Sequence, residues 1–286
     1  MGQYHSVQFI AVVLAVGLLS GTSPGQEMLR REISGSAIKE LNVSIDLSFG
    51  HATLKRGTTK AIAVVEYTKP EEDDYKLDVD YSVNEEVGSL VIRSEEESSF
   101  WDRSDKEHRE WIIELTDRVP LSLSFKLGAG EGELDLTGLQ LHDIKISTGA
   151  SAVRLTCDEP NRIRANTIDI ESGVSKLTAR NLCNTNFRRM RFSGGVGTYV
   201  LDYGGRLITD AEVTIEVGLG AVTVYLPEDV PTRIKHDDSW FSSFDLDHDF
   251  LKKSKGVYES AAFGFSTKRL VIAIESGLGS VKVRRR

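Results

Sequence analysis

Apolar and polar residues alternate along most of the chain, and glycine interrupts the alternation at regular places. The recurring pattern is apolar-x-apolar, two residues, Gly, one residue, a small residue, one residue and apolar-x-apolar again. Alternation with a period of two predicts short β-strands, and a glycine between two of them predicts a corner in the chain. Clear copies are anchored by Gly130, Gly149, Gly173, Gly195, Gly218 and Gly277, and a looser copy by Gly50.

The spacing of these copies favours coils that stack on one another. The first five clear anchors are 19, 24, 22 and 23 residues apart, and 59 residues separate Gly218 from Gly277. A unit of two short strands cannot bury its apolar face alone, so repeats of this period predict a stack. A meandering antiparallel sandwich is the alternative, although it gives no reason for a nearly constant period. We predict an all-β fold with a right-handed β-solenoid, coils of about 22–24 residues and Gly corners.

The charged residues of the copies are consistent with stacking. In a stack, the residue between the two apolar positions of each first strand lies next to its counterpart in the following coil. Lys145, Asp169 and Arg191 occupy this position in three consecutive copies and alternate in sign, and Asp135 and Arg154 begin the equivalent row after the corner. Opposite charges on adjacent strands contribute from a few tenths to about 1 kcal/mol. We interpret these charges first as a structural ladder.

The chain divides into regions with different patterns. Residues 1–25 form a separate segment, residues 26–120 an N-terminal antiparallel β region, and residues 121–286 the solenoid repeats with an insertion at 227–269. In the N-terminal region, strands are predicted over 62–67, 76–83, 89–92 and 111–115, with a hairpin loop at 84–88. The insertion carries Trp240, Phe241 and Phe244. We expect it to cover the open end or side of the stack and to offer these aromatic residues as an interaction surface.

The first 25 residues predict export. Eleven apolar residues at 9–19 are followed by small and turn-forming residues, and Cys is absent from this part of the sequence. A membrane-spanning helix needs about 20 apolar residues, whereas the apolar part of a secretory signal peptide has about 7 to 15. A buried N-terminal strand is the structural alternative. The favoured interpretation is a signal peptide cleaved near Gly25, with no transmembrane segment in the mature chain and a periplasmic or extracellular location.

Composition narrows the function classes further. The 43 Asp and Glu residues outnumber 35 Lys and Arg residues, giving a formal charge of −8. Such a chain is a poor partner for nucleic acid, because affinity for nucleic acid rests largely on neutralising phosphates. No spacing of His, Cys, Asp or Ser residues matches a metal site or a catalytic triad. Asp245, Asp247 and Asp249 resemble the start of a calcium loop, but Phe250 and Gly256 stand where that loop needs Gly and Glu. No cofactor, metal or catalytic residue is therefore expected.

The two cysteines leave two alternatives open. Cys157 and Cys183 are 26 residues apart, close to one repeat, so in a stack they would lie on adjacent coils. An exported chain meets oxidising conditions, which favour a disulfide. Two buried free thiols are the equally weighted alternative.

One run of the sequence resembles a known family. The sequence is similar to the bacterial toast-rack family at residues 119–130, which read Val-Pro-Leu-Ser-Leu-Ser-Phe-Lys-Leu-Gly-Ala-Gly, and at residues 134–139, which read Leu-Asp-Leu-Thr-Gly-Leu. The later Gly-x-Gly copies and Leu226-Pro227 are similar to that family as well. That family is related to LiaF-like cell-wall-active antibiotic response proteins and to a broad group of proposed adhesin domains. The resemblance covers roughly residues 28–286. It implies an N-terminal toast-rack domain followed by β-solenoid coils in a bacterial envelope protein, and it transfers no catalytic residues.

Two functional hypotheses follow. The leading one is an exported cell-envelope protein that binds or scaffolds in an adhesin-like role, with an envelope protein or glycan as partner and a connection to envelope stress as one variant. The other is a carbohydrate-active β-solenoid enzyme, for which Asp135, Arg154, Asp169 and Arg191 are the only stacked candidates. Their alternating signs favour the non-enzymatic hypothesis. A surface groove with two carboxylates about 5 to 9.5 Å apart would favour the enzyme.

Overall fold

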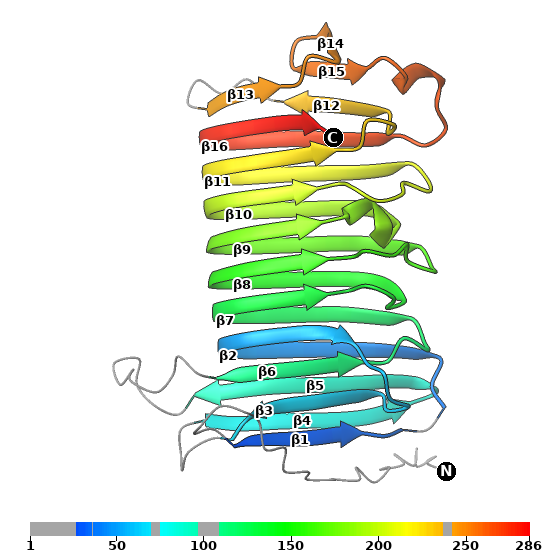
Figure 1. Ribbon diagram of the computed structural model, residues 1–286, viewed down its shortest axis with the longest axis vertical. Coiled ribbons are helices and arrows are strands. Elements are labelled where there is room, and N and C mark those ends of the chain that lie inside the picture. The colour runs from blue at the N-terminus through cyan, green and yellow to red at the C-terminus, as the bar shows by residue number, and fades with distance from the viewer. Residues whose placement is uncertain (1–26, 36, 70–74, 97–108, 237–241) are drawn as a thin grey trace, which may run out of the picture.

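The computed structural model describes residues 27–35, 37–69, 75–96, 109–236 and 242–286, and these residues form one stack of β-strands (Figure 1). All the strands belong to a single sheet in the order β1-β3-β6-β2-β7-β8-β9-β10-β11-β16-β12-β15-β14, with β4 joined to β5 and β13 to β16. The strands are β1 (Met28–Ile33), β2 (Glu40–Arg56), β3 (Ala63–Thr68), β4 (Tyr75–Asn84), β5 (Val87–Glu96), β6 (Glu110–Leu115), β7 (Leu121–Asp135), β8 (Leu141–Thr156), β9 (Ala165–Arg180), β10 (Phe187–Asp202), β11 (Ala211–Leu226), β12 (Thr232–His236), β13 (Ser242–Leu246), β14 (Phe250–Ser254), β15 (Val257–Ser260) and β16 (Leu270–Arg285). Two short 3-10 helices, η2 (Leu182–Thr185) and η3 (Phe263–Phe265), lie in connections.

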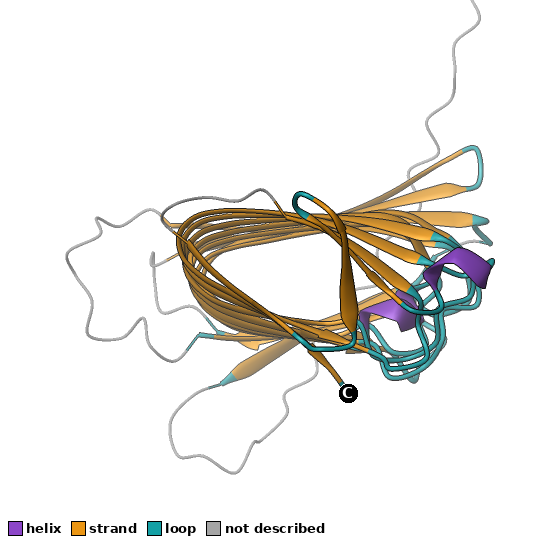
Figure 2. Ribbon diagram, turned by 90° about the horizontal axis from the view of Figure 1, so that it is seen from above, coloured by secondary structure: helices purple, strands orange, loops and turns teal. Residues whose placement is uncertain are grey.

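The seven copies of the sequence pattern are the seven long strands β2, β7 to β11 and β16. Each has 15 to 17 residues and bends in the middle, so that its two legs run along opposite walls of the stack (Figure 2). Neighbouring long strands pair in parallel along both legs. This arrangement confirms the predicted all-β, solenoid-like stack.

The core lies between the two walls and is built from aligned rows of apolar side chains. One such row runs through every long strand on the first wall, and each of its members is at most 1% exposed. It consists of Ile45, Phe125, Ile146, Ile170, Phe192, Ile215 and Ile274. Because alternate residues of a strand point to opposite faces, the same alternation that fills the core places polar residues on the outer walls.

The register of the first clear copy differs from the prediction by two residues. Gly128, and not Gly130, aligns with Gly149, because Ala129 pairs with Ala150. The interval between the first two corners is therefore 149 − 128 = 21 residues, which removes the irregular value of 19. The corner at 128–130 contains two glycines, so the sequence pattern fits either of them.

The corners bring backbones of successive coils close together. At Gly220, whose φ is +141°, a Cβ atom would lie 1.9 Å from the carbonyl oxygen of Gly197 in the preceding coil. Such a φ is rarely adopted by residues with a side chain. Glycine is therefore needed there both for the backbone conformation and for the stacking distance.

The N-terminal region contains the predicted strands but continues the stack. Strands β3, β4, β5 and β6 cover the four predicted segments, and β4 and β5 form the predicted hairpin. Pairing is antiparallel among β1, β3 and β6, whereas β2 pairs in parallel with β5, β6 and β7. The sheet consequently passes without a break from the N-terminal region into the solenoid repeats, and the looser copy in β2 is the first complete coil.

The insertion between β11 and β16 lies over the end of the stack. Strand β12 pairs with the first leg of β16, β13 pairs with its second leg, and β14 and β15 complete the cover (Figure 1). We call β12 to β15 the end cap. β16 thus lies between β11 and the end cap, although it follows the end cap in the sequence.

Candidate binding surfaces

The predicted row of alternating charges lies on the first wall, which is formed by the strand legs that precede the corners. Lys145, Asp169 and Arg191 are direct neighbours on β8, β9 and β10. The ion pairs, however, run diagonally, since Lys145 lies 3.8 Å from Glu171 and Arg191 lies 2.8 Å from Glu216. The hydrogen bond from Arg191 to Glu216 raises the pKa of the Arg191 guanidinium. Oδ1 of Asp169 is shut off from solvent and lacks a hydrogen-bond partner in the described part of the chain.

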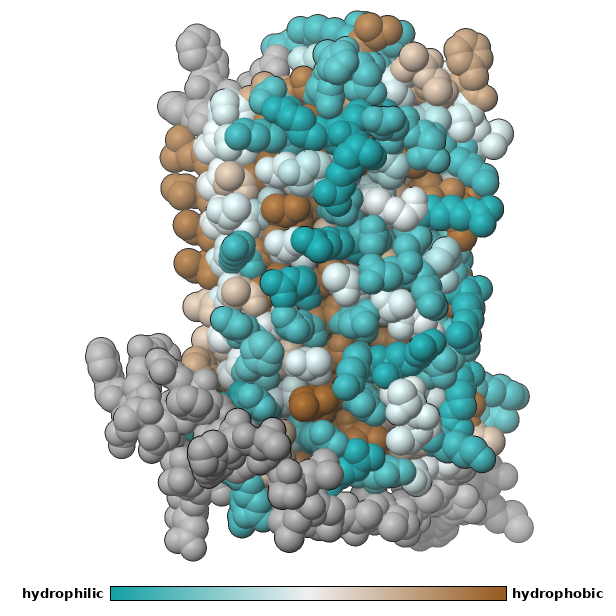
Figure 3. Space-filling model, in the orientation of Figure 1, coloured by the Kyte–Doolittle hydropathy of each residue, from teal (hydrophilic) through white to brown (hydrophobic). Residues whose placement is uncertain are grey.

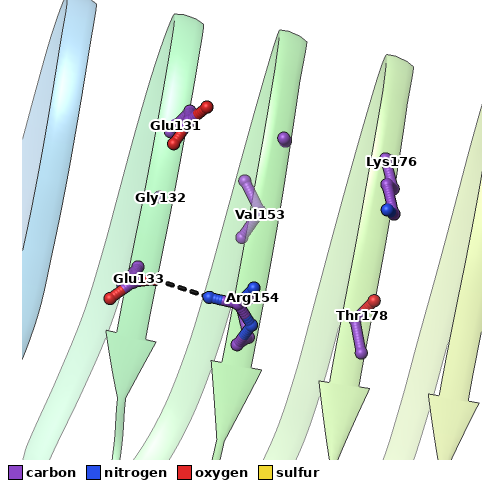
Figure 4. A pocket seen from close by; sticks show the side chains of 8 residues that line it. Glu131, Gly132, Glu133, Val153, Arg154, Lys176 and Thr178 are labelled. Carbon is purple, nitrogen blue, oxygen red and sulfur yellow. Dashed lines mark hydrogen bonds and ion pairs between the residues drawn. The ribbon is translucent and has the colours of Figure 1, made fainter.

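The equivalent row on the second wall is also shifted by two residues. Arg154 pairs in register with Glu133 and forms an ion pair with it at 2.5 Å, whereas Asp135 is the neighbour of Thr156. A hollow of about 160 Å³ lies beside this ion pair and also contains Glu131 and Lys176 (Figure 4). That volume is below the range of about 300 to 1,000 Å³ that is usual for ligand sites. Because Asp135 and Arg154 lie on one wall while Asp169 and Arg191 lie on the other, the four candidate catalytic residues do not form one site.

A larger hollow, which we call the first-wall trough, crosses the first wall near the N-terminal end of the stack. Its volume is about 420 Å³, and it extends over β5, β2, β7, β8 and β9. Its polar lining consists of Asn42, Ser44, Ser89, Ser122, Ser124, Asp143, Lys145, Thr167 and Asp169. The trough exists because β5, β2 and β7 present short side chains outward where β8 presents Lys145.

Two carboxylates face the first-wall trough from neighbouring strands. Asp143 lies on β8 and Asp169 on β9, one strand and two residues apart, so the two are diagonal neighbours on the wall. Asp143 accepts hydrogen bonds from the backbone N–H of Thr167 at 3.1 Å and from its hydroxyl at 2.6 Å. Its carboxylate is therefore tied into the wall, while Asp169 keeps one unpartnered oxygen among the described residues.

The outer tips of the corners form a continuous apolar line, which we call the corner ridge. The middle residues of successive corners pair in register along the whole stack. They are Phe49, Ala129, Ala150, Val174, Val196, Leu219 and Leu278. Val174 is 65% exposed, Val196 45%, Leu219 48% and Leu278 52%. Figure 3 shows the ridge as a column of apolar side chains along the left edge of the stack.

Of the three aromatic residues that the sequence offered as an interaction surface, Phe244 lies among the described residues. Trp240 and Phe241 lie outside the described residues. Phe244 is half-buried in the end cap, where its ring stacks on His236 with centroids 4.0 Å apart and lies 5.7 Å from the ring of Tyr258. One part of the Phe244 side chain thus packs within the cap, and the rest stays accessible to solvent.

The aspartates of the insertion bind Arg284 and Arg285, whereas Arg286 pairs with Asp202 of β10. Asp245 pairs with Arg284, and Asp249 accepts a hydrogen bond from Nε of Arg285 at 2.9 Å. Arg285, whose side chain is only 7% exposed, also donates to the carbonyl oxygens of Pro227 and Val230 and lies over the ring of Phe250. In the described part of the chain, no group of His, Cys, Asp or Glu is arranged to hold a metal ion.

The two cysteines are separate buried thiols in the structure. Cys157 follows β8, and Cys183 lies in η2 of the next coil connection, where Asn184 donates a hydrogen bond to the carbonyl oxygen of Cys157 at 2.9 Å. Burial raises the pKa of each thiol to about 12, with nearby Asp135 and Asp202 adding to the effect at Cys157 and Cys183 respectively. Both thiols are consequently protonated and unreactive at neutral pH.

The corner ridge and the trough were not identified from the sequence. The sequence indicates the ridge, because from β7 to β16 the residue between the two small corner residues becomes steadily larger, from Ala to Val to Leu. The sequence indicates the trough only weakly, through serines at outward positions of β2 and β7, two strands that are far apart in the sequence. Its recognition requires the register between β2 and β7.

The chain is similar to known domains and structures. The family model of the N-terminal domain of toast_rack (DUF2154) matches residues 23–180, slightly more than half of the chain. A solved structure of a "putative cell adhesion protein" from Clostridium sporogenes is 18% identical, with a TM-score of 0.50, and the match covers 92% of this chain and 100% of that one. A "putative adhesin" from Bacteroides fragilis is 12% identical, with a TM-score of 0.37 and coverages of 92% and 100%. No curated protein matches the sequence. Among the described residues, none of the helical segments is long and apolar enough to cross a membrane.

Proposed function

Because the chain belongs to the family of the N-terminal domain of toast_rack, we propose that it is an exported protein of the bacterial cell envelope that binds a partner in an adhesin-like role without catalysis. The apolar segment at 9–19, followed by small residues, supports export to the periplasm or the cell surface. The Clostridium sporogenes protein of the same fold bears a name that refers to cell adhesion. A link to envelope stress is a narrower form of this proposal, and a sensor kinase encoded beside the gene would support it.

The corner ridge is the observation that carries the proposal. Single exposed apolar residues are common on protein surfaces, but contiguous exposed apolar patches mark contact surfaces, and the ridge has large exposed side chains on the four successive coils of β9, β10, β11 and β16. The flanking corner positions from β7 to β16 are glycine or serine, so no charged residue lies directly beside the ridge residue on either side. The ridge therefore presents an uncharged, apolar edge on a chain whose formal charge is −8.

The test is binding of the purified protein to cell-envelope fractions of the source bacterium. The variant Val174→Ser/Val196→Ser/Leu219→Ser removes the apolar ridge, and we expect at least a tenfold loss of binding. Leu251→Ser is the matched control, since Leu251 is 55% exposed in β14 and lies off the ridge. Equal binding by the wild type and the triple variant would refute the ridge as the contact surface.

The aromatic residues at 240 and 241 provide a second arm of the same experiment. Trp240, Phe241 and Phe244 remain a proposed interaction surface, and the variant Trp240→Ala/Phe241→Ala tests it while leaving Phe244, whose ring stacks on His236, unchanged. If this variant loses binding to envelope fractions and the ridge variant keeps it, the contact surface lies on the insertion and not on the corner ridge.

Catalysis on a carbohydrate is the second candidate function, and one observation favours it. Asp143 and Asp169 both line the first-wall trough from neighbouring strands, and glycosidases use a pair of carboxylates on either side of the bond that they cleave. Against it, the hydrogen bonds from Thr167 occupy the Asp143 carboxylate. Glycan turnover by the wild type that disappears in Asp143→Asn and in Asp169→Asn would establish the enzyme and overturn the non-catalytic proposal.

A further inference from the structure

The first-wall trough has the dimensions of a site for an extended ligand. Its polar side chains form two rows that cross neighbouring strands in register. The first row is Ser89, Asn42, Ser122, Asp143 and Thr167, and the second is Ser44, Ser124, Lys145 and Asp169. Five neighbouring strands at about 4.8 Å spacing extend over about 19 Å along the stack axis. The volume of about 420 Å³ lies within the usual range for ligand sites.

The lining of the trough offers hydrogen-bonding capacity that the protein itself does not use. Within the described residues, the side chains of Asn42, Ser44 and Ser124 have no intramolecular hydrogen bond, and all three are exposed. Each can both donate and accept. Asp169, on the opposite side of the trough, adds the unpartnered buried oxygen Oδ1. A ligand that supplies donors and acceptors close together along its length would satisfy this set.

The charges and the position of the trough exclude several ligand classes. Asp143 and Asp169 disfavour a polyanion, and Lys145 disfavours a polycation, so the lining suits a neutral ligand. An extended peptide gains affinity by adding a strand to a free sheet edge. The trough lies on the face of a sheet whose strands are paired on both sides from β2 to β8, so a peptide would find no backbone partners there.

We propose that the first-wall trough binds a neutral glycan chain that lies along the stack axis. Sugar hydroxyls donate and accept hydrogen bonds at short intervals, which matches the rows of serine, asparagine and aspartate. Successive rings of an extended glycan advance by a distance close to the strand spacing, so one ring can meet each coil. This proposal rests on the proposed binding function and specifies a class of ligand for it. The trough is a different surface from the corner ridge.

The experiment is isothermal titration calorimetry of the full mature chain with three neutral hexasaccharides, namely cellohexaose, hexa-N-acetylchitohexaose and maltohexaose. An oligogalacturonate hexamer is the anionic comparison. Ser124→Arg fills the trough at its centre, and Asp169→Asn removes the carboxylate while keeping its size. Thr198→Arg places the same arginine at an exposed position after the corner of β10, away from the trough, and is the matched control.

We expect at least one neutral hexasaccharide to bind the wild type and Thr198→Arg equally, with at least tenfold weaker binding to Ser124→Arg and weaker binding to Asp169→Asn. Circular dichroism spectra of the variants establish that each is folded. Absence of binding to all three neutral hexasaccharides, preference for the galacturonate hexamer, or equal binding by Ser124→Arg would overturn the proposal. None of these results would change the binding of the corner ridge to envelope fractions. The glycan proposal can therefore be refuted without refuting the proposed function, and the reverse also holds.

Discussion

Tyr199 packs directly over Gly194, at the point where β10 approaches its corner. A Cβ atom on Gly194 would lie 2.5 Å from Cε2 of Tyr199. The adjacent coils have Ser172 and Val217 in register with Gly194, and smaller side chains in register with Tyr199. The large ring in this coil thus occupies space that a side chain fills in its neighbours, and it meets the ring of Phe192 edge-on at a centroid distance of 5.0 Å.

This pairing predicts a compensating double substitution. Gly194→Ala forces a methyl group against the Tyr199 ring, and overpacking of this kind costs about 1–3 kcal/mol. Tyr199→Leu removes the clash, so the double variant should lose less stability than the sum of the two single variants. Urea denaturation of the four proteins measures the coupling, and additive losses would contradict the packing relation.

The corner glycines predict position-specific intolerance. Gly220→Ala combines an unfavourable φ with a Cβ atom 1.9 Å from the carbonyl oxygen of Gly197, so we expect a loss of more than about 2 kcal/mol or failure to fold. Gly264 is the matched control, because a Cβ atom there meets nothing within 4 Å. Gly264→Ala should leave the thermal unfolding temperature nearly unchanged, and an equal drop in both variants would refute the stacking argument.

Arg285 predicts a local effect on the end cap. Arg285→Ala removes the donor to two buried carbonyl oxygens and one carboxylate, and hydrogen bonds of charged groups contribute about 1.5–3 kcal/mol. We expect faster hydrogen exchange in β12 to β15 with little change in β7 to β10. The neighbouring Arg284→Ala removes the exposed ion pair with Asp245 and the hydrogen bonds to the carbonyl oxygens of Asp245 and Val283, and we expect it to lower the unfolding free energy less than Arg285→Ala does. Uniform loss of protection along the stack would contradict a cap-specific role.

The cysteines predict a change in thiol reactivity on unfolding. If Cys157 and Cys183 are the buried free thiols seen in the structure, Ellman's reagent should detect none in the native protein and two after denaturation without reductant. Zero thiols in the denatured, unreduced protein would establish the disulfide instead.

The same thiols predict a loss of stability at alkaline pH. Their pKa values are raised by burial from 9.0 to about 12, so the unfolded chain releases protons first as the pH rises. The stabilisation is complete below about pH 9 and is lost between pH 9 and 12. One pH unit corresponds to about 1.4 kcal/mol for each thiol. Under reducing conditions, Cys157→Ala/Cys183→Ala should show a smaller fall in unfolding free energy between pH 8 and pH 10, and equal falls would refute the assignment.

The repeats could be predicted from the sequence because burial and corner geometry are local requirements. Each coil must alternate apolar residues along both legs, and each corner needs small residues, so seven copies predicted seven long strands. The register of the first copy could not be fixed in this way. Gly128 and Gly130 satisfy the same local pattern, and only pairing of Ala129 with Ala150 distinguishes them.

The candidate binding surfaces could not be predicted from the sequence, because they depend on which residues lie side by side on neighbouring strands. The ion pairs of Lys145 and Arg191 are diagonal because long side chains reach past their direct neighbour, which register alone does not reveal. The trough joins serines of β2 and β7, which are adjacent in space but separated in the chain by β3, β4, β5 and β6. An aromatic residue in an insertion, such as Phe244, can serve a surface contact or internal packing, and the sequence alone does not distinguish the two. In the structure the ring of His236 stacks on Phe244.

The position of β16 between β11 and the end cap makes the order of assembly differ from the order of synthesis. Residues 227–269 leave the ribosome before β16, yet β12 and β13 pair with β16 and not with β11. Until β16 is complete, β11 presents an open edge to the solution, and the cap strands have no template to join. A chain that has folded only as far as β11 is therefore vulnerable to pairing with another chain until β16 is in place, and a chaperone that covers the edge of β11 would protect it during that interval.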